Sequence, residues 1–259
     1  MNIAVVGYGK MGRMVLAEAR RLGHNVPVTM DAFDKAAFVR YSPDRPETLA
    51  GAVKISGAEG VIEFTDPAVV VNNIEILLPL RIPLVVGTTG WKDQEGRVAE
   101  LAAKTNGVVL RSANFSLGVN LFYKVASYAA GLFADYDEYD VALWEGHHNQ
   151  KADSPSGTAM EIARLILEAD KKKTRIVTET LHRRPDPEEL TVSSSRVGSM
   201  PGSHRVIFDS EADTIEMTHT ARNRVGFAVG AVRALERLTA LLAEGKLPWG
   251  RLYGMEDVL

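Results

Sequence analysis

A short apolar run at the start of the chain, Ile3 to Val6, leads directly into Gly7-Tyr-Gly9-Lys-Met-Gly12. Such a run is typical of a strand buried on both faces in a parallel sheet, and helical spacing of apolar residues follows the glycines. Between a strand and a helix, Gly7 allows a tight turn, Gly9 lets the backbone approach a pyrophosphate, and Gly12 lets the helix pack closely on the strand. The pattern predicts a dinucleotide site with the phosphates at the helix N-terminus.

A second predicted strand, residues 26–32, ends near Asp31, at the distance where an acid accepts hydrogen bonds from the adenosine ribose. A glycine turn and a strand-end aspartate without a ligand are the weaker alternative, because the two features occur together. Ala32 stands where an NADP-specific site often has an arginine, which favours NADH. Arg13 and Lys35 remain available for a 2′-phosphate, so the use of both cofactors stays open.

Strand-like and helical patterns alternate through the N-terminal half, which predicts an α/β fold with a Rossmann-type doubly wound parallel sheet. Ligands of such sheets lie beyond the carboxyl ends of the strands. This places Phe64-Thr65, Gly87-Thr88-Thr89 and Ser112 to Phe115 on the cofactor side, although each segment could also be an ordinary turn. The expected strands are 60–65, 82–90 and 107–115, and the expected helices are 68–78 and 92–104.

The pattern changes after Asn114 and predicts a second α+β domain built on a mixed or antiparallel sheet. We expect the first domain to span 1–116 and to be completed by 229–259. The second domain, 117–228, is then a substrate-binding and oligomerisation domain. Its expected elements are helices 121–133 and 158–173 and strands 139–145, 175–182, 190–198, 204–210 and 214–221, the last two forming a hairpin, before a final helix at 225–246.

The composition argues against several other classes of protein. The chain has no cysteine, so neither a disulfide framework nor a thiolate metal site can form. A net charge of −3 gives no reason to expect nucleic acid or an anionic membrane as a partner. No apolar run approaches the ~20 residues of a membrane span, and the first residues do not resemble a signal peptide. We therefore expect a soluble, cytoplasmic protein.

The stretch "EGHHNQKADSPSGTA", residues 145–159, gathers groups that suit a small dicarboxylate. Thr158 and Glu161 form a capping-box pattern, which predicts a helix that begins near Gly157 with amides able to bind an anion. Lys151 adds an ammonium group, and His147 and His148 add imidazoles. If the preceding strand continues through the histidines, its alternation turns only one of them toward the cleft.

A histidine can give up a proton near neutral pH, and a reductase of a C=N or C=C bond needs a proton as well as a hydride. Two alternatives are disfavoured. A metal held by the histidines and Asp153 lacks the usual ligand spacing and would be repelled by Lys151. Ser156 does not lie in a nucleophile motif. A third alternative, that His147 and His148 are ordinary surface or interface residues, stays open at this point.

The same stretch resembles the signature E-x-H-H-x-x-K-x-D-x-P-S-G-T-A of the dihydrodipicolinate reductase family. The resemblance extends through "VGYGKMGR", "GTTG", "ANFSLGVN" and "HTARNRVGFAVGAVRA", so it covers both predicted domains. It implies a homotetramer that uses NADH or NADPH to reduce the cyclic dicarboxylate 4-hydroxy-tetrahydrodipicolinate, on the diaminopimelate route to lysine. Other two-domain NAD(P)-dependent amino-acid or sugar dehydrogenases, and a non-catalytic dinucleotide sensor, remain the alternatives.

The resemblance also implies roles for single residues. His147 would donate the proton to C3 while hydride reaches C4, and Lys151 would assist catalysis and bind a substrate carboxylate. His148 and the amides of Gly157 and Thr158 would bind the dicarboxylate, and no metal is implied. The implied cofactor-binding residues are Gly7, Tyr8, Gly9, Lys10, Met11, Gly12, Asp31, Gly87, Thr88, Thr89, Ser112, Ala113, Asn114 and Phe115.

Overall fold

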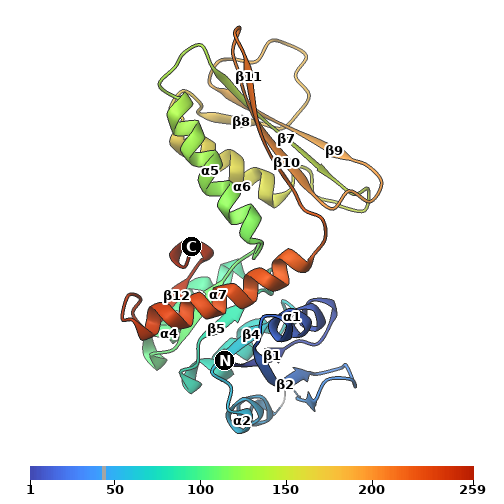
Figure 1. Ribbon diagram of the computed structural model, residues 1–259, viewed down its shortest axis with the longest axis vertical. Coiled ribbons are helices and arrows are strands. Elements are labelled where there is room, and N and C mark those ends of the chain that lie inside the picture. The colour runs from blue at the N-terminus through green and yellow to red at the C-terminus, as the bar shows by residue number, and fades with distance from the viewer. Residues whose placement is uncertain (43–44) are drawn as a thin grey trace. The chain divides into compact units, whose positions relative to one another are not determined.

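The computed structural model describes residues 1–42 and 45–259 and divides into two compact units (Figure 1). Unit 1 comprises Met1–Leu117 and Val225–Leu259. Unit 2 is a single continuous segment, Gly118–Arg224. The chain therefore leaves unit 1 once, builds unit 2, and returns to finish the first unit.

The returning segment is the helix α7 (Val225–Ala243), which belongs to unit 1 over its whole length. The predicted boundary after residue 228 is wrong because it cuts this helix. Buried side chains from Ala228 to Leu242 pack in one cluster with the strands of unit 1, so the helix docks as one piece.

No helix in the described part of the chain, α7 included, is long and apolar enough to cross a membrane.

Unit 1 contains a seven-stranded sheet in which every pairing is parallel. The strand order is β12-β6-β5-β4-β1-β2-β3, so the direction of winding reverses between β1 and β4. This confirms the predicted doubly wound fold. The strands are β1 (Asn2–Val6), β2 (Asn25–Asp31), β3 (Val39–Arg40), β4 (Gly60–Glu63), β5 (Leu84–Val86), β6 (Val108–Arg111) and β12 (Arg251–Tyr253).

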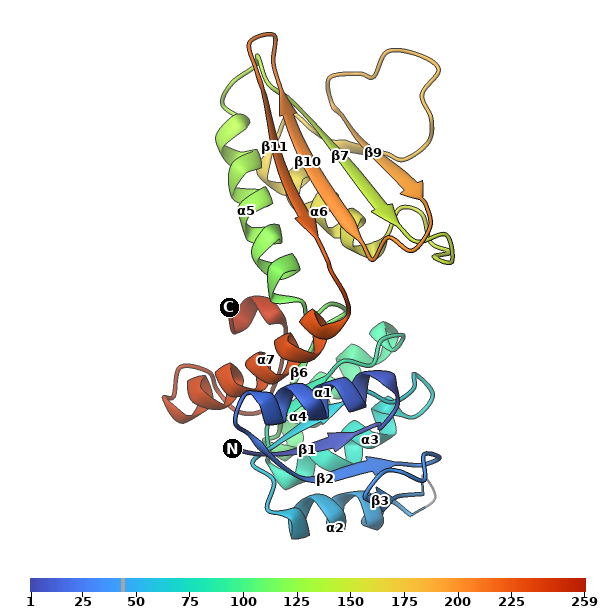
Figure 2. The ribbon, with the colours of Figure 1, turned by 45° about the vertical axis from the view of Figure 1, so that its right-hand side comes forward.

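Helices cover both faces of this sheet (Figure 2). One buried cluster joins α1 and α7 to the sheet, and a second joins α2, α3 and α4 to it. The sequence interpretation missed α2, β3 and β12. The two strands have only two and three residues, and each takes its strand form by pairing with a neighbour, β3 with β2 and β12 with β6. The helices are α1 (Lys10–Arg21), α2 (Pro46–Ser56), α3 (Val70–Leu77) and α4 (Glu95–Thr105), with 3-10 turns η1 (Leu78–Leu80), η2 (Lys92–Gln94) and η3 (Met255–Asp257).

Unit 2 is built on the predicted mixed sheet, with strand order β11-β10-β7-β9-β8. The central strand β7 pairs parallel with β9 and antiparallel with β10, and two helices pack on its apolar face. The predicted strand 175–182 is shorter, because residues 178–180 are exposed and bury no face. The elements are α5 (Leu117–Phe133), β7 (Asp140–His147), α6 (Gly157–Ala169), β8 (Arg175–Val177), β9 (Glu189–Arg196), β10 (Ser203–Asp209) and β11 (Thr214–Thr220).

The glycine-rich turn between β1 and α1 depends on close backbone contact. Gly7 has a φ of +89°, which side chains rarely allow. A Cβ on Gly12 would overlap the carbonyl oxygen of Gly7. The turn therefore needs glycine at both positions before any ligand is considered.

We predict that Gly12→Ala lowers the free energy of unfolding by roughly 1–3 kcal/mol, the usual cost of forcing atoms into a packed site. Gly51→Ala is the matched control, because a Cβ on Gly51 in α2 meets nothing within 4 Å. An alanine there should stabilise the protein by up to about 1 kcal/mol through helix propensity. Urea unfolding measures both values, and equal effects of the two substitutions would contradict the packing argument.

Candidate active site

The predicted cofactor segments lie side by side at one edge of the first sheet. Hydrogen bonds continue the ladder past the strand ends, from the amide of Phe64 to Val6 O at 2.8 Å and from Gly87 to Glu63 O at 2.9 Å. The amide of Ser112 bonds Val86 O at 3.3 Å in the same way. The turns after β1, β4, β5 and β6 therefore meet at the carboxyl edge, where a doubly wound sheet binds its ligand.

Asp31 at the end of β2 lies beside the glycine turn. Its carboxylate accepts the amides of Tyr8 at 2.7 Å, Phe33 at 2.8 Å and Asp34 at 2.9 Å. Burial on its own raises the pKa of Asp31, but these amides outweigh it and hold that pKa below its usual range. The carboxylate is therefore ionised and fixed in place, as an acceptor for ribose hydroxyls must be.

The N-terminus of α1 has the features of a phosphate site. Its N-cap is Gly9, which makes no side-chain capping bond, and a Cβ there would meet nothing within 4 Å. Lys10, Met11 and Gly12 form the first turn behind it. The amides of this turn thus lack a capping side chain, and the backbone at Gly9 has open space beside it, which fits the close approach of a pyrophosphate.

A cavity of about 100 Å³ separates the segments that follow β5 and β6. Phe115, also predicted to bind cofactor, instead buries its side chain in the core and packs edge-to-face on Phe64, with ring centroids 6.2 Å apart. Only its backbone is left to face a ligand. The cavity is lined by Thr88, Thr89, Gly90, Trp91, Lys92, Glu95, Arg111, Ser112 and Ala113.

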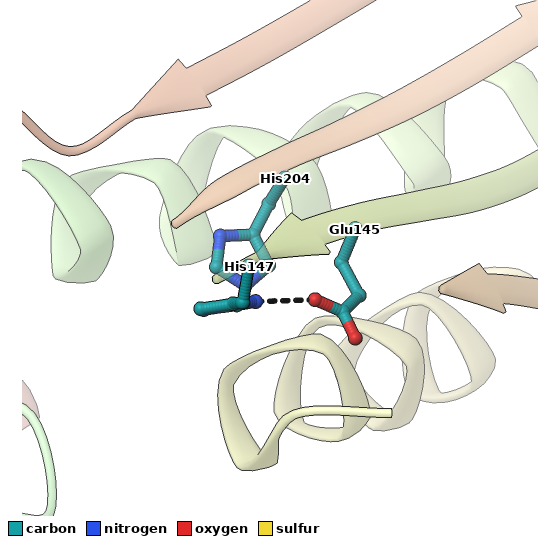
Figure 3. Close-up of side chains that lie close together, drawn as sticks. All are labelled: Glu145, His147 and His204. Atoms are coloured by element: carbon teal, nitrogen blue, oxygen red, sulfur yellow. Dashed lines mark hydrogen bonds and ion pairs between the residues drawn. The ribbon is translucent and has the colours of Figure 1, made fainter. Parts of the chain in front are cut away.

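In unit 2, the strand β7 places Glu145 and His147 on the same face of the sheet, because side chains two residues apart in a strand point the same way. The carboxylate of Glu145 is fully buried and bonds Nδ1 of His147 (Figure 3). The His147 side chain keeps 12% of its surface exposed. His148 follows the strand end and is half-buried. Of the two adjacent histidines, His147 is therefore the one that the structure pairs with this buried carboxylate.

Two further groups bond the same carboxylate. Arg196 at the end of β9 donates to Oε1 of Glu145 at 2.8 Å, and the amide of Ser156 donates to it at 3.2 Å. The strand register explains why Arg196 reaches this carboxylate, since Arg196 lies opposite His147 in the parallel pairing of β7 with β9. Burial on its own raises the pKa of Glu145, but the bonds from Arg196 and His147 hold it below its usual range. Glu145 is therefore ionised near neutral pH beside His147.

His204 completes this cluster from β10, where it lies opposite Glu145. Its ring stands edge-on to that of His147, with centroids 5.3 Å apart (Figure 3). Oγ of Ser156 lies 3.2 Å from its Nε2. Burial first, and then the neighbouring His147, lower the pKa of His204 to about 4. His204 is therefore neutral near pH 7 and is a poor candidate for the proton donor.

The loop between β7 and α6 already surrounds one carboxylate with donors. Nζ of Lys151 lies 2.8 Å from Oδ1 of Asp153. The Lys151 ammonium, helped by the backbone amide of Gly157, holds the pKa of Asp153 below its usual range. The predicted ammonium and amide donors are thus close enough to share a carboxylate.

The structure at the start of α6 differs from the predicted capping box. The N-cap is Ser156, whose Oγ accepts the amide of Ala159 at 3.1 Å, and not Thr158. Thr158 lies inside the first turn, and its side chain bonds the hydroxyl of Tyr123. Glu161 pairs with Arg164 at 2.6 Å. Gly157 still begins the helix, because a serine cap one residue earlier starts it there.

Among the described residues, Glu145, His147 and His204 form a group whose ligand atoms lie within 4.8 Å of one another, as in a metal site. The charges disfavour that use. Arg196 is bonded to the carboxylate, and a guanidinium beside a bound cation would repel it. The cluster is better explained as a carboxylate–histidine pair than as a metal centre.

Sequence reasoning missed four members of this cluster: Glu145, Arg196, His204 and Ser156 in its capping role. Only Glu145 had a usable signal, since strand alternation places it on the face of His147. Arg196 and His204 are distant in sequence and reach the site through strand pairing.

A larger cavity, about 490 Å³, lies between α7 and the C-terminal residues and includes no predicted site residue.

A doubly wound sheet with a glycine turn, together with a unit that holds a carboxylate–histidine pair beside a helix N-terminus, is typical of NAD(P)-dependent oxidoreductases. Family comparison narrows this class. Residues 1–115 match the family described as dihydrodipicolinate reductase, N-terminus, and residues 118–259 match dihydrodipicolinate reductase, C-terminus. The chain belongs to the dihydrodipicolinate reductase family, which confirms the resemblance seen in its motifs.

Individual relatives agree over the full length. A 4-hydroxy-tetrahydrodipicolinate reductase of Archaeoglobus fulgidus is 37% identical and covers 100% of both chains. That of Christiangramia forsetii is 35% identical over 92% of each chain. A dipicolinate-bound dihydrodipicolinate reductase from Paenisporosarcina sp. TG-14 has a TM-score of 0.78 at 22% identity, covering 100% of this chain and 99% of that one. The last similarity shows the fold alone.

The buried carboxyl of Glu63 in unit 1 predicts an unusual pH dependence of stability. Burial, opposed by hydrogen bonds from Thr65 and Thr88, raises its pKa from 4.5 to about 7. Folding therefore favours the protonated form, and the stability it contributes is complete below pH 4.5 and lost as pH rises through 7. The glutamine of Glu63→Gln does not titrate. From about pH 5 to 8 the free energy of unfolding of the variant should therefore rise by about 3 kcal/mol relative to that of the wild type.

Urea unfolding of both proteins across this pH range measures the difference. Glu100→Gln is the control, since its side chain is 76% exposed and should follow the wild type. Parallel stability curves for the wild type and Glu63→Gln would show that Glu63 keeps an ordinary pKa.

Proposed function

We propose that this chain catalyses the NAD(P)H-dependent reduction of 4-hydroxy-tetrahydrodipicolinate to tetrahydrodipicolinate, a step of the diaminopimelate route to lysine. The observation that carries the proposal is the buried Glu145–His147 pair at the end of β7, on a chain that belongs to this reductase family. Lys151 and the N-terminus of α6 follow the pair in the sequence and supply donors for a carboxylate.

His147 is proposed as the general acid. Bound NAD(P)H supplies a hydride, and the ring carbon next to the reduced one needs a proton. Glu145 accepts the hydrogen bond from Nδ1 of His147, which fixes the orientation of the imidazole ring. Loss of the 4-hydroxyl group as water leaves a C3=C4 double bond in the ring. Nε2 of His147 then donates its proton to C3 while C4 receives the hydride. Arg196 and the Ser156 amide keep Glu145 ionised throughout.

The substrate carboxylates are proposed to bind Lys151, His148 and the amides of Gly157 and Thr158. The Asp153 carboxylate supports this assignment, because it already pairs with Lys151 and accepts a hydrogen bond from the Gly157 amide. A substrate carboxylate has the same charge and acceptor geometry and would compete for these donors.

The proposed cofactor residues are the glycine turn, Asp31 and the segments after β5 and β6, and we propose NADH as the preferred cofactor. The ionised Asp31 favours ribose hydroxyls over a 2′-phosphate. Arg13 does not neutralise Asp31, because it pairs with Asp34 at 2.5 Å and covers the ring of Tyr8. The fold alone does not decide between the two cofactors, since an engineered D-amino acid dehydrogenase bound to NADP⁺ shares it at a TM-score of 0.55 and 14% identity.

We propose that unit 1 binds the dinucleotide, and that unit 2 binds the substrate and joins the subunits of a cytoplasmic homotetramer. An exposed apolar stripe along α5 supports self-association: Leu121, Val125, Tyr128 and Leu132 recur at helical spacing, with Tyr128 70% exposed. Light scattering on the purified chain would give its oligomeric mass.

The function is tested by following nicotinamide oxidation in the presence of a dihydrodipicolinate synthase that generates the unstable substrate. Oxidation that requires the synthase supports the proposal, and the rates with NADH and NADPH give the cofactor preference. Cofactor binding without turnover would favour a non-catalytic sensor. Turnover of an open-chain amino acid or a sugar instead would favour another dehydrogenase.

We predict that His147→Gln lowers kcat by roughly 10²–10⁴-fold, the usual contribution of a general acid, with cofactor affinity unchanged. His182→Gln is the control, because His182 is exposed in the loop after β8. Steady-state kinetics at saturating cofactor gives both values. Turnover near that of the wild type in the His147 variant would remove it from the acid role.

We predict that Lys151→Ala raises the KM for the dicarboxylate by roughly 10- to 100-fold, the equivalent of one hydrogen bond to a charged group. Lys171→Ala is the control, since Lys171 is exposed beyond the end of α6. Initial rates against substrate concentration measure the change. An unaltered KM would place the carboxylate elsewhere.

A further inference from the structure

Glu63, the last residue of β4, has a fully buried side chain. The residues before it, Gly60, Val61 and Ile62, are those expected in a central strand covered on both faces. A carboxyl group at such a position loses its hydration, so it needs hydrogen-bond donors that an apolar residue would not. None of the predicted site roles explains why a glutamate ends this strand.

The donors to Glu63 come from two loops and a helix. Thr88 donates its hydroxyl to Oε2 at 2.7 Å, and Thr65 donates its hydroxyl to Oε1. Nδ2 of Asn73 in α3 lies 3.5 Å from Oε1. Thr65 follows β4 and Thr88 follows β5, which are paired neighbours in the sheet. One carboxylate therefore ties together the loops at the ends of two adjacent strands.

Thr88 is held from two further directions. Its hydroxyl oxygen accepts the amide of Thr65 at 2.7 Å, and its carbonyl oxygen accepts Nε1 of Trp91 at 2.7 Å. Because the hydroxyl oxygen already accepts the amide, its own proton is directed at Glu63. The loop after β5 thus keeps this arrangement as long as Glu63 can accept the hydrogen bond from the Thr88 hydroxyl.

Both loops lie on the β4–β5 side of the point where the strand order reverses. A dinucleotide in a doubly wound fold spans that point. Its adenosine half is expected beside Asp31, over β1 and β2, so its nicotinamide half extends over β4 and β5. We propose that Glu63 is a positioning residue, whose carboxylate holds the loops after β4 and β5 in the conformation that binds the nicotinamide half. The inference rests on the proposed function, because it requires NAD(P)H as the cofactor.

The ionised form of Glu63 is the one that fits these contacts. The hydroxyl protons of Thr65 and Thr88 both point at its oxygens, and a protonated carboxyl would place its own hydrogen against one of them. Burial raises the pKa of Glu63 to about 7, against the effect of the hydrogen bonds. We therefore expect cofactor affinity to fall as the pH drops below about 7.

The other titratable groups around this network keep their charge near neutral pH. The hydroxyl of Tyr41 lies 3.2 Å from Nδ2 of Asn73, and burial raises the pKa of Tyr41, so the phenol stays neutral. Asp31 acts electrostatically on Tyr41 and is ionised, with its pKa below the usual range. Neither group titrates together with Glu63.

Glu63→Gln tests the proposal in the full-length protein, because glutamine keeps the shape of the side chain but can accept on only one side. Titration with NADH gives Kd at about pH 6, 7 and 8, and steady-state rates give kcat and both KM values. At about pH 8 we expect Kd and the KM for NADH to rise about tenfold. The kcat at saturating NADH and the KM for the dicarboxylate should stay within about twofold, since Glu63 touches neither reactant. Glu100→Gln is the surface control.

The pH profile separates positioning from a general structural role. Wild-type Kd should rise from about pH 8 to pH 6, whereas the Kd of Glu63→Gln should stay flat, because glutamine does not titrate. An unchanged Kd and KM for NADH in the variant would overturn the proposal. A loss confined to kcat, or the same pH dependence in both proteins, would overturn it too.

Thr65→Val provides a second variant, since Thr65 is not among the proposed cofactor residues and the substitution removes the hydroxyl that reaches Oε1 of Glu63, which should raise Kd in the same direction. It keeps the proposal testable if Glu63→Gln fails to fold. Wild-type protein that binds neither NADH nor NADPH would reject the proposed function itself, and this inference with it. Wild-type binding with an unaffected variant rejects the inference alone.

Discussion

The carboxylate of Glu145 is buried where an unpaired charge would be costly, and the chain around it supplies donors from three directions. Arg196 reaches it from β9, the Ser156 amide from the start of α6, and His147 from two residues along the same strand. Without this carboxylate the Arg196 guanidinium would lose its ion-pair partner, and the His147 imidazole would lose the acceptor that orients it. The end of β9, the start of α6 and the proposed acid all depend on one side chain.

Unit 1 also contains a buried glutamate, Glu63, but its pKa is shifted in the opposite direction from that of Glu145. Glu63 also lies at the end of a central strand and also holds loops together, but its donors are hydroxyl and amide groups without charge. Burial therefore dominates, and its pKa rises to about 7, whereas Arg196 helps to hold the pKa of Glu145 below its usual range. Glu145 is ionised near neutral pH beside the proposed acid, whereas Glu63 can change charge near neutral pH.

Much of this architecture could be predicted because it depends on local pattern. Apolar runs, helical spacing and the glycine turn indicated the parallel sheet, and alternation in residues 139–145 indicated β7. The missed strands β3 and β12 lack such a pattern. The strand β12 has three residues and pairs with β6. The cap of α6 is Ser156 rather than Thr158, because the Ser156 hydroxyl accepts the amide of Ala159 in the first turn.

The sequence by itself determined the doubly wound fold class, the family, and the candidate roles of His147, Lys151 and the glycine turn, because these follow from residue type and short spacing. Only the tertiary structure decided their partners. Arg196 lies 51 residues from Glu145, and Thr88 lies 25 residues from Glu63. Strand pairing and register bring such residues together, and register depends on the packing of the whole sheet rather than on any local stretch of sequence.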